Sequence, residues 1–547
     1  MVAQLATFAF LGIDARPVDV QVQISGGANA FSIVGLPDKA VSEARDRVRG
    51  ALSAIGIGLP PKRVTINLAP ADLPKEGAHF DLPIALALMA EAGAAPKDAI
   101  ADFAVLGELG LDGSIRKING VLPAAIAANS QDLGLICPAA NGTEATWAGN
   151  GLKILAPASI IQLINHFKGT QLLTRPQASS PNNIAPTNDK SADDKSGITG
   201  PLENSGDVKP FLDLSDVKGQ ETAKRALEVA AAGGHNLLMI GPPGAGKSML
   251  ASRLPNLLPP LSPEEMLDVS MIQSVAGLLQ NGAIAKERPF RAPHHSASMA
   301  AMVGGGTKAK PGEASLAHHG VLFLDELPEF SPQVIDSLRQ PLETGDVMIA
   351  RANMHVRYPA RFQLIAAMNP CRCGYGHGDG RTCSRGPKCS ASYQARISGP
   401  LLDRIDMTVN LAPVTAADLL AATQGERTQD VASRVASARQ AARERRTQST
   451  GAYALNSALP DGVIADFATP DPEGIQLLAR ATETLGFSAR AYHRVLKLSR
   501  TLADLDGSDG VRRRHVAEAI SYRQSNEQSA APPSVIQPNT AQAFRVS

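Results

Sequence analysis

The segment GPPGAGKS, residues 241–248, has the residue types and spacing that bind phosphate groups. It follows the apolar run NLLMI at 236–240, which is typical of a buried parallel strand. Strand, glycine-rich turn and helix in this order form the context of a phosphate-binding loop. Backbone N–H groups would surround a β-phosphate, Lys247 would reach the β and γ oxygens, and the Ser248 hydroxyl would bind Mg²⁺. The sequence therefore predicts ATP and Mg²⁺ as cofactors, with nucleotide held by Gly241, Pro242, Pro243, Gly244, Ala245, Gly246, Lys247 and Ser248.

Two adjacent acids form the second part of the predicted site. Asp325 and Glu326 end the apolar run in GVLFLDELPEF, residues 320–330. Since the carboxyl ends of parallel strands share one sheet edge, we expect Asp325 to hold the same Mg²⁺ through water. Glu326 would then act as the general base for the attacking water. The alternative is that both acids cap the following helix.

An amide and an arginine could complete this site. Asn369 ends a third apolar run, QLIAAMNP at 363–370, and its side chain could orient the attacking water. Arg404 lies in ISGPLLDRIDM, where a subunit could project a guanidinium toward its neighbour's γ-phosphate. The alternative for Arg404 is an ion pair with Asp403 or Asp406.

A second arginine could close over the same phosphate from a C-terminal helical domain. Arg490 lies in the helical pattern FSARAYHRVLKLSRTLADL, residues 487–505. Arg494 follows one helical turn later and is the competing candidate.

Four of the five cysteines are close together in the sequence. Cys371, Cys373, Cys383 and Cys389 lie in a Gly- and Arg-rich loop with little apolar sequence to hold it together. Four thiolates suit tetrahedral Zn²⁺, which would order such a loop. His377 could replace one thiolate, and the alternative is four free or redox-active cysteines. We therefore expect a structural zinc site.

Length and composition predict several folded parts. A chain of 547 residues is too long for one hydrophobic core. Residues 172–209 are rich in Ser, Pro, Asn, Asp and Gly and cannot bury enough apolar surface to offset their ordering entropy, so they are predicted to form a flexible linker. The predicted domains are 1–171, 210–415 and 416–524, followed by a disordered tail at 525–547.

Charge and hydropathy limit the possible partners. The formal net charge is +1, so binding to a polyanion would need local basic patches. No apolar stretch is long enough for a membrane helix, and the N-terminus lacks the basic region of a signal peptide. We expect a cytoplasmic protein that has no membrane partner.

Several sequence segments along the chain resemble those of a known family. They are RPFRAPHHSAS (288–298), PGEASLAHHGVLFLDELPEF (311–330), ISGPLLDRIDM (397–407) and SARAYHRVLKLSRTLADL (488–505). Together they resemble the magnesium-chelatase-like AAA+ family, and within it the ComM/YifB branch. The resemblance implies an α/β fold class, with a P-loop AAA+ ATPase domain followed by a C-terminal helical lid domain.

The same resemblance implies roles and partners. Asn369 would be sensor 1, Arg404 the arginine finger and Arg490 sensor 2. The expected assembly is a hexameric ring of identical subunits. ComM proteins are described as helicases that drive branch migration during natural transformation, so the implied partner is branched or single-stranded DNA.

The N-terminal segment alternates strand and helix patterns and resembles the proteolytic α/β domain of Lon, with its S5-like fold. The matching stretches are PKEGAHFDLPIALALM (74–89) and LGELGLDGSIRKINGVLPAAIAA (106–128). The position of the serine nucleophile is His79 and that of the lysine is Leu122, while Lys117 is displaced by five residues. A Ser-Lys dyad needs a hydroxyl and an amine, so this domain is expected to be inactive and to aid oligomerisation or bind DNA.

Three basic or His-rich segments could contact DNA or metal. Residues 347–364 are predicted to form a β-hairpin that carries Arg351, Arg357 and Arg361, either for phosphate contact or as a solvated surface. A predicted helix from Asp430 to Arg446 is Arg-rich, and the same two alternatives apply to its residues Arg434, Arg439, Arg443, Arg445 and Arg446. An insertion lies between the two nucleotide motifs. For its residues we favour loop or interface packing over metal binding. It contains VGGG at 303–306, Lys308, Lys310, His294, His295, His318 and His319.

The leading hypothesis is an ATP-driven ring motor acting on branched DNA. The second is a protein-remodelling or metal-chelatase motor that needs a partner subunit, since magnesium chelatase shares the ATPase core. The third, an ATP-dependent protease, is disfavoured by His79 and Leu122.

Overall fold

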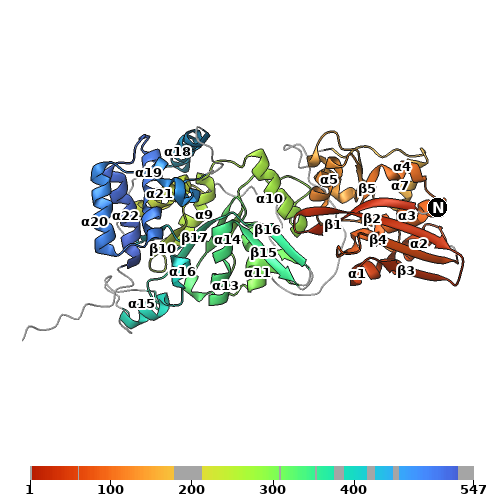
Figure 1. The fold of residues 1–547 in the computed structure, drawn as a ribbon, viewed down its shortest axis with the longest axis horizontal. Coiled ribbons are helices and arrows are strands. Elements are labelled where there is room, and N and C mark those ends of the chain that lie inside the picture. Colours follow the sequence, from red (N-terminus) through yellow and green to blue (C-terminus); the bar gives the residue numbers. More distant parts are fainter. Residues whose placement is uncertain are drawn as a thin grey trace, which may run out of the picture.

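The computed structural model describes residues 3–59, 61–177, 212–306, 309–351, 354–374, 383, 387–414, 425–447 and 455–527. The predicted linker lies outside the described residues from 178 onward, and the predicted tail from 528 onward. Lys308, His377 and the side chains of Arg351 and Arg446 also lie outside them. The molecule is elongated, and the chain runs along its long axis from the N-terminal part, through a central sheet, to a group of C-terminal helices (Figure 1).

The N-terminal part is a seven-stranded mixed sheet in the order β3-β4-β2-β1-β5-β8-β9. Helices α2 (Ala44–Ala54) and α3 (Asp81–Glu91) pack on one face, and α5 (Val121–Ser130) packs on the other. The apolar composition of α3 predicts burial on nearly all of its faces, and every residue from Asp81 to Ala90 is buried. The strands are β1 (Ala3–Leu11), β2 (Asp14–Ser25), β3 (Ala30–Val34), β4 (Arg63–Ala69), β5 (Phe103–Val105), β8 (Gly134–Ile136) and β9 (Ile154–Leu155).

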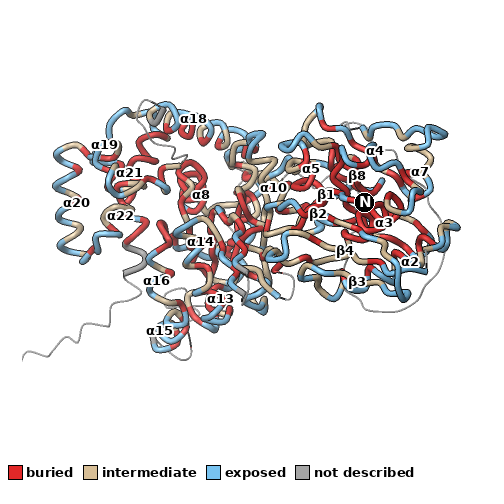
Figure 2. Tube along the Cα trace, turned by 45° about the vertical axis from the view of Figure 1, so that its right-hand side comes forward, coloured by how far each residue is buried: buried red, intermediate tan, exposed pale blue. Residues whose placement is uncertain are grey.

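The central part is a five-stranded sheet in the order β11-β14-β17-β10-β18, with every pair of neighbours parallel. Its strands are β10 (Leu237–Ile240), β11 (Phe290–Arg291), β14 (Val321–Leu324), β17 (Gln363–Met368) and β18 (Met407–Asn410). Alternate residues of these strands belong to two hydrophobic clusters, one with α8 (Glu221–Gly233) and α9 (Lys247–Leu257) and one on the opposite face. Figure 2 shows buried residues inside both this part and the N-terminal part. The predicted mixed α/β fold with a parallel sheet is therefore present.

The C-terminal part consists of helices that pack against α8 and against one another. The longest is α18 (Thr428–Thr447), which matches the helix predicted from Asp430 to Arg446; the others include α20 (Pro472–Leu485), α21 (Ala489–Leu505) and α22 (Arg513–Glu527). No helix among the residues that the structure describes combines the length and apolar character needed to span a bilayer.

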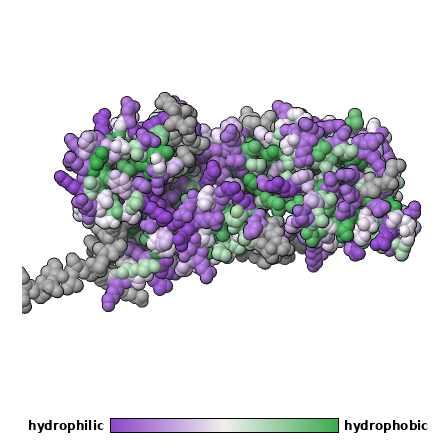
Figure 3. Space-filling view, viewed as in Figure 1, coloured by the Kyte–Doolittle hydropathy of each residue, from purple (hydrophilic) through white to green (hydrophobic). Residues whose placement is uncertain are grey.

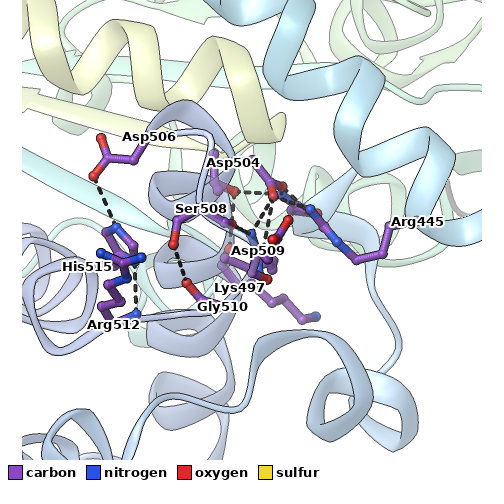
Figure 4. A network of polar contacts seen from close by, with 12 residues as sticks. Arg445, Lys497, Asp504, Asp506, Ser508, Asp509, Gly510, Arg512 and His515 are labelled. Atoms are coloured by element: carbon purple, nitrogen blue, oxygen red, sulfur yellow. Dashed lines mark hydrogen bonds and ion pairs between the residues drawn. The ribbon is translucent and has the colours of Figure 1, made fainter.

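The C-terminal helices are joined by a buried polar network around Asp504 of α21. The Asp504 carboxylate accepts hydrogen bonds from Arg500, Arg445 and the side-chain amide of Asn456. Figure 4 shows Arg445 of α18 reaching toward Asp504. A buried carboxylate with this many donors is satisfied without water, so the network fixes α18 against α21.

The N-terminal and central parts meet at α10 (Pro263–Ala276), which lies between them in Figure 1. The buried carboxylate of Glu144 accepts hydrogen bonds from Ser274 Oγ at 2.5 Å, from Leu122 N at 3.1 Å and from Asn141 Nδ2 at 2.8 Å. In addition, Trp147 Nε1 donates to the carbonyl of Gly282 at 3.0 Å. This junction is polar, and each donor to the carboxylate is itself buried. On the face seen in Figure 3, hydrophilic side chains alternate with small apolar patches over both parts.

Candidate nucleotide-binding site

The phosphate loop joins β10 to α9 at the carboxyl edge of the central sheet. Gly244 and Gly246 have φ values of +79° and +87°, a region that L side chains rarely adopt. Gly241 is required for a different reason, because a Cβ there would lie 2.8 Å from Leu411 Cβ. Helix α9 begins at Lys247, so the backbone N–H groups of its first turn point toward the loop. The loop and helix therefore have the geometry typical of an anion-binding helix N-terminus.

The Lys247 ammonium connects the loop to the neighbouring strand. Its Nζ donates to the carbonyls of Gly241 at 2.6 Å and Pro242 at 2.9 Å, and to Asn369 Oδ1 at 3.0 Å. Burial lowers the pKa of Lys247, while the nearby carboxylates of Asp325 and Glu326 act in the opposite direction. Asn369, which was predicted from the end of an apolar run, is thus brought within contact of the phosphate loop.

The two predicted Mg²⁺ ligands lie together. Ser248 Oγ donates to Asp325 Oδ2 at 2.7 Å, and both residues are at the sheet edge that the phosphate loop occupies. Glu326 follows with a positive φ of +53°, and its backbone N–H donates to Asp325 Oδ1 at 2.9 Å. The Glu326 side chain is half exposed and accessible to water.

His295 lies beside this acid pair, a position that was not predicted from the sequence. His295 Nδ1 lies 3.8 Å from Glu326 Oε2, and the His295 ring lies 4.0 Å from that of His294. The pair of histidines follows β11, the strand beside β14, and so reaches the same edge of the sheet. In the sequence, this position is indicated only by RAPHH following a short strand, which is a weak signal by itself.

The two candidate arginines of α21 have different surroundings. Arg494 donates to the Ile405 carbonyl at 3.0 Å and lies 3.5 Å from Asp406 Oδ1, so it connects α21 to the start of β18. Arg490 is exposed at the first turn of the helix and forms no hydrogen bond or ion pair with any residue in the described ranges. Of the two, Arg490 is therefore the one available for a phosphate.

Arg404 is buried rather than projecting. Its guanidinium pairs with Glu343 and donates to the Pro400 carbonyl. Its Nε is buried without a hydrogen-bond partner among the described residues. The alternative predicted from the sequence, an ion pair of Arg404 with Asp403 or Asp406, therefore named the wrong partner. Asp406 instead interacts with Arg494, with the backbone of Asn236 and with the ring of His235.

The four clustered cysteines come together in space. The sulfur atoms of Cys371, Cys373, Cys383 and Cys389 all lie within 4.8 Å of one another. The Sγ atoms of Cys371 and Cys373 are 2.8 Å apart. Three of the four cysteines are buried and form a hydrophobic cluster of their own, separate from the main cores.

The other His residues do not favour a metal site. His318, His319 and Asp268 lie close enough to share an ion. However, His318 Nδ1 accepts a hydrogen bond from the Arg361 backbone N–H at 2.9 Å, which assigns the proton to Nε2 and leaves no free lone pair. Burial lowers the pKa of His318 to about 3, as expected for a neutral packed ring. The predicted preference for packing over metal agrees with this geometry.

The basic segments differ from a simple DNA-binding surface. The predicted hairpin is present as β15 (Asp346–Arg351) and β16 (Met354–Pro359), and Arg357 in it pairs with Asp346. In α18 three of the predicted surface arginines instead bind within the protein: Arg434 to Glu228 and Glu426, Arg439 to the Ala231 carbonyl, and Arg445 to Asp504. Arg443 remains exposed. The reason is that α18 packs on α8 and α21 along the face that carries these arginines.

His79, Leu122 and Lys117 of the N-terminal part have different surroundings. His79 is buried, with Nε2 3.0 Å from the Phe8 carbonyl, and burial lowers its pKa to about 4. Leu122 is buried, and Lys117 is exposed. His79 and Lys117 line a cavity of about 360 Å³ whose opposite wall, including Tyr358, comes from the central part.

Comparisons with known proteins agree with this arrangement. The family described as magnesium chelatase, subunit ChlI, matches residues 213–419; a second ChlI family matches 20–141, and the ChlI C-terminal family matches 425–523. Competence protein ComM of Haemophilus influenzae is 42% identical over 518 residues, covering 94% of this chain and 96% of that protein. Protein YifB of Escherichia coli is 42% identical over 519 residues, with the same coverage. The magnesium-chelatase 38 kDa subunit of Rhodobacter capsulatus is 29% identical over 187 residues, covering 31% of this chain and 53% of that subunit.

Proposed function

We propose, on the premise that this chain belongs to the ComM/YifB family of magnesium-chelatase-like AAA+ proteins, that it is an ATP-hydrolysing motor acting on DNA. Family membership favours ATP hydrolysis with Mg²⁺. The observation that supports the ATPase most strongly is the convergence of two contacts at one sheet edge, Ser248 with Asp325 and Lys247 with Asn369. The step from ATPase to DNA motor is a separate part of the proposal.

The proposed hydrolysis uses residues at that edge. Phosphates would bind the N–H groups of the loop at the start of α9, where the helix dipole favours negative charge. Lys247 would exchange a loop carbonyl for a phosphate oxygen, and Ser248 and Asp325 would hold Mg²⁺, which neutralises charge on the β and γ oxygens. Glu326 would take the proton of the attacking water, and the amide of Asn369 would orient that water.

The site is completed in this proposal by arginines from other elements. Arg490 would close over the γ-phosphate from α21. Arg404 would serve a neighbouring subunit in a ring, as the ring assembly typical of the family suggests, and a hexamer is the stoichiometry we propose. Arg404 pairs with the half-exposed Glu343, so it would have to exchange this partner for the neighbour's phosphate.

Branched or single-stranded DNA is the substrate we propose, with branch migration as the activity. The relative in Haemophilus influenzae is named a competence protein, a name that fits work on incoming DNA. Within this chain the supporting surface is the β15–β16 hairpin, where Arg357 is two-thirds exposed, rather than α18. Phosphate contacts of this kind would be independent of sequence and sensitive to salt.

Zinc is the proposed ligand of Cys371, Cys373, Cys383 and Cys389. Zn–S bonds of about 2.3 Å place tetrahedral sulfurs about 3.8 Å apart. The observed separations, all within 4.8 Å, fit this geometry after small movements. The four thiols would lose their protons on binding.

The N-terminal domain is proposed to be a proteolytically inactive, Lon-like domain at 1–171, followed by a linker, an ATPase domain at 210–415 and a helical domain at 416–524. Neither His79 nor Leu122 supplies the hydroxyl and amine of a Ser-Lys dyad. A location in the cytoplasm suits a motor on DNA and a cluster of cysteines that would bind metal, and we propose it on those grounds.

A second candidate is a chelatase-type or protein-remodelling motor. It is favoured by the likeness to the magnesium-chelatase 38 kDa subunit, which covers about a third of this chain. Such a motor would need a partner subunit to select its substrate.

Steady-state ATP hydrolysis distinguishes these candidates. The rate of ATP hydrolysis is measured without DNA, with linear duplex DNA, and with three-way and four-way DNA junctions. Lys247→Ala serves as the control that lacks phosphate-loop function. Selective stimulation by junctions supports the DNA motor. Robust turnover that no DNA changes would reject it in favour of the second candidate.

A further inference from the structure

The cysteine cluster lies beside the nucleotide site. Cys371 follows Asn369 by two residues, and Asn369 Oδ1 accepts the hydrogen bond of Lys247 at 3.0 Å. Cys371 is 1% exposed, so its sulfur is anchored inside the protein. Any movement of this sulfur would therefore be transmitted over two residues to the side chain that contacts the phosphate-loop lysine.

The same segment packs directly on the phosphate loop. A Cβ placed on Gly374 would lie 2.8 Å from Pro243 Cγ, so the backbone at Gly374 and the Pro243 ring are in close contact. Gly374 has a φ of +91°, which allows the turn that brings Cys373 back toward the other thiols. Pro243 is in the middle of the loop expected to surround the β-phosphate. The cluster thus touches the loop as well as the sensor strand.

A third connection leads to the acid pair. Helix α15 (Pro387–Gln394) carries Cys389, and its Ser390 Oγ donates to the Pro370 carbonyl at 2.8 Å. Just beyond this helix, Arg396 Nη1 donates to Glu329 Oε2 at 3.0 Å. Glu329 follows Glu326 by three residues, in the short helix η5 (Leu327–Glu329). The cysteine-bearing helix is therefore tied both to the sensor turn and to the segment after the general base.

Among the described residues, little apolar packing holds these connections together. The buried residues of this cluster are three cysteines, Cys371, Cys383 and Cys389, and it is separate from the large cores on either side of the central sheet. A segment with so small a core needs another source of order, which four metal–thiolate bonds would supply. Metal binding would then be linked to the shape of the phosphate loop.

We propose that the four thiolates bind one zinc ion and thereby hold Asn369, Pro243 and Glu329 in the arrangement that binds ATP. This inference rests on the proposed function, since it assigns a role in nucleotide binding to the cluster. It makes the affinity for ATP dependent on zinc, although the cluster supplies no group to the reaction. The cysteines are thus positioning residues.

The test uses the full-length protein and two readouts. Zinc is counted by atomic emission spectrometry, and affinity is measured with a fluorescent ATP analogue. Cys371→Ser and Cys389→Ser should each lose the zinc and weaken nucleotide binding at least about tenfold, which is about 1.4 kcal/mol. Cys137→Ala is the matched control, because Cys137 is a buried free thiol of the N-terminal part and should leave both readouts unchanged.

A chelation experiment guards against variants that fail to fold. Zinc is removed from the unmodified protein with a high-affinity chelator, nucleotide affinity is measured, and zinc is then restored. Loss of affinity that returns with zinc supports the inference. Wild-type protein that binds ATP without any zinc, or that keeps its affinity after zinc is removed, overturns the inference and leaves the proposed ATPase intact. Protein that holds zinc yet binds no ATP overturns the proposed function, and the inference with it.

Discussion

Ser248 Oγ and Asp325 Oδ2 are 2.7 Å apart although 77 residues separate them in the sequence. One lies at the start of α9 and the other just after β14, and β17 lies between β14 and β10 in the sheet. Parallel strands bring both residues to one edge, where an oxygen pair of this kind suits a hard cation. The contact is the structural basis for the Mg²⁺ site that we propose at these two residues.

Ser248→Ala and Asp325→Asn should each raise the Mg²⁺ concentration needed for half-maximal ATP hydrolysis, by about 10- to 100-fold. Because both act on one ion, the double variant should show less than the product of the two effects. Ser252→Ala is the control, since this hydroxyl lies on the same helix and donates to the Met249 carbonyl. Independent, fully multiplicative effects would argue against a shared ion.

Glu326→Gln should reduce single-turnover ATP hydrolysis by about 10²- to 10⁴-fold, the range typical of losing a general base. Binding of ATP should persist, because the half-exposed carboxylate is not part of the phosphate loop. Rapid-quench measurement of hydrolysis alongside nucleotide titration separates the two. A variant that hydrolyses ATP at nearly the normal rate would remove Glu326 from the proposed role.

Acid should destabilise the N-terminal part through His79. Its pKa is about 4 in the folded chain against an ordinary 6.5, because burial disfavours the imidazolium. Between these values the unfolded chain takes up a proton that the folded chain does not, so stability is lost as pH falls from 6.5 to 4. The loss from this group is roughly 3 kcal/mol.

His79→Gln keeps a donor for the Phe8 carbonyl and does not titrate, so it should remove this part of the pH dependence. Denaturant unfolding followed by the fluorescence of Trp147, the one tryptophan of the chain, reports on the N-terminal part. If wild-type and variant lose the same stability between the two pH values, His79 is not the titrating group.

Two arginines of α18 provide a matched pair. Arg439 is buried and donates twice to the Ala231 carbonyl, and burial lowers its pKa to about 9, whereas Arg443 is exposed. Arg439→Ala should destabilise the protein by about 2 kcal/mol. Arg443→Ala should change stability by less than about 0.5 kcal/mol. Urea unfolding of both variants checks the difference, and equal effects would show that α18 does not pack as described.

The arginines of α18 also show what sequence could not predict. The helix itself follows from its composition, but its buried face depends on where α8 and α21 lie, which no local pattern contains. The ion-pair partner of Arg404 could not be predicted for the same reason, since Glu343 is 61 residues away in the sequence. By contrast, a run of apolar residues in the sequence predicts each of the strands that precede Lys247 and Asp325. Parallel pairing of the strands is then enough to bring their carboxyl ends together. The position of His295 beside Glu326 was not predicted, because β11, the strand that leads to it, has only two residues.

Unwinding of a four-way DNA junction is the most direct test of the proposed motor. A labelled junction is incubated with ATP and Mg²⁺ and with either wild-type protein or Lys247→Ala, and the strands are separated on a gel. Wild-type protein should resolve the junction only when ATP is hydrolysed, and Lys247→Ala should leave it intact while still folding normally. A wild-type protein that hydrolyses ATP but never unwinds junction or single-strand-tailed DNA would contradict the proposal.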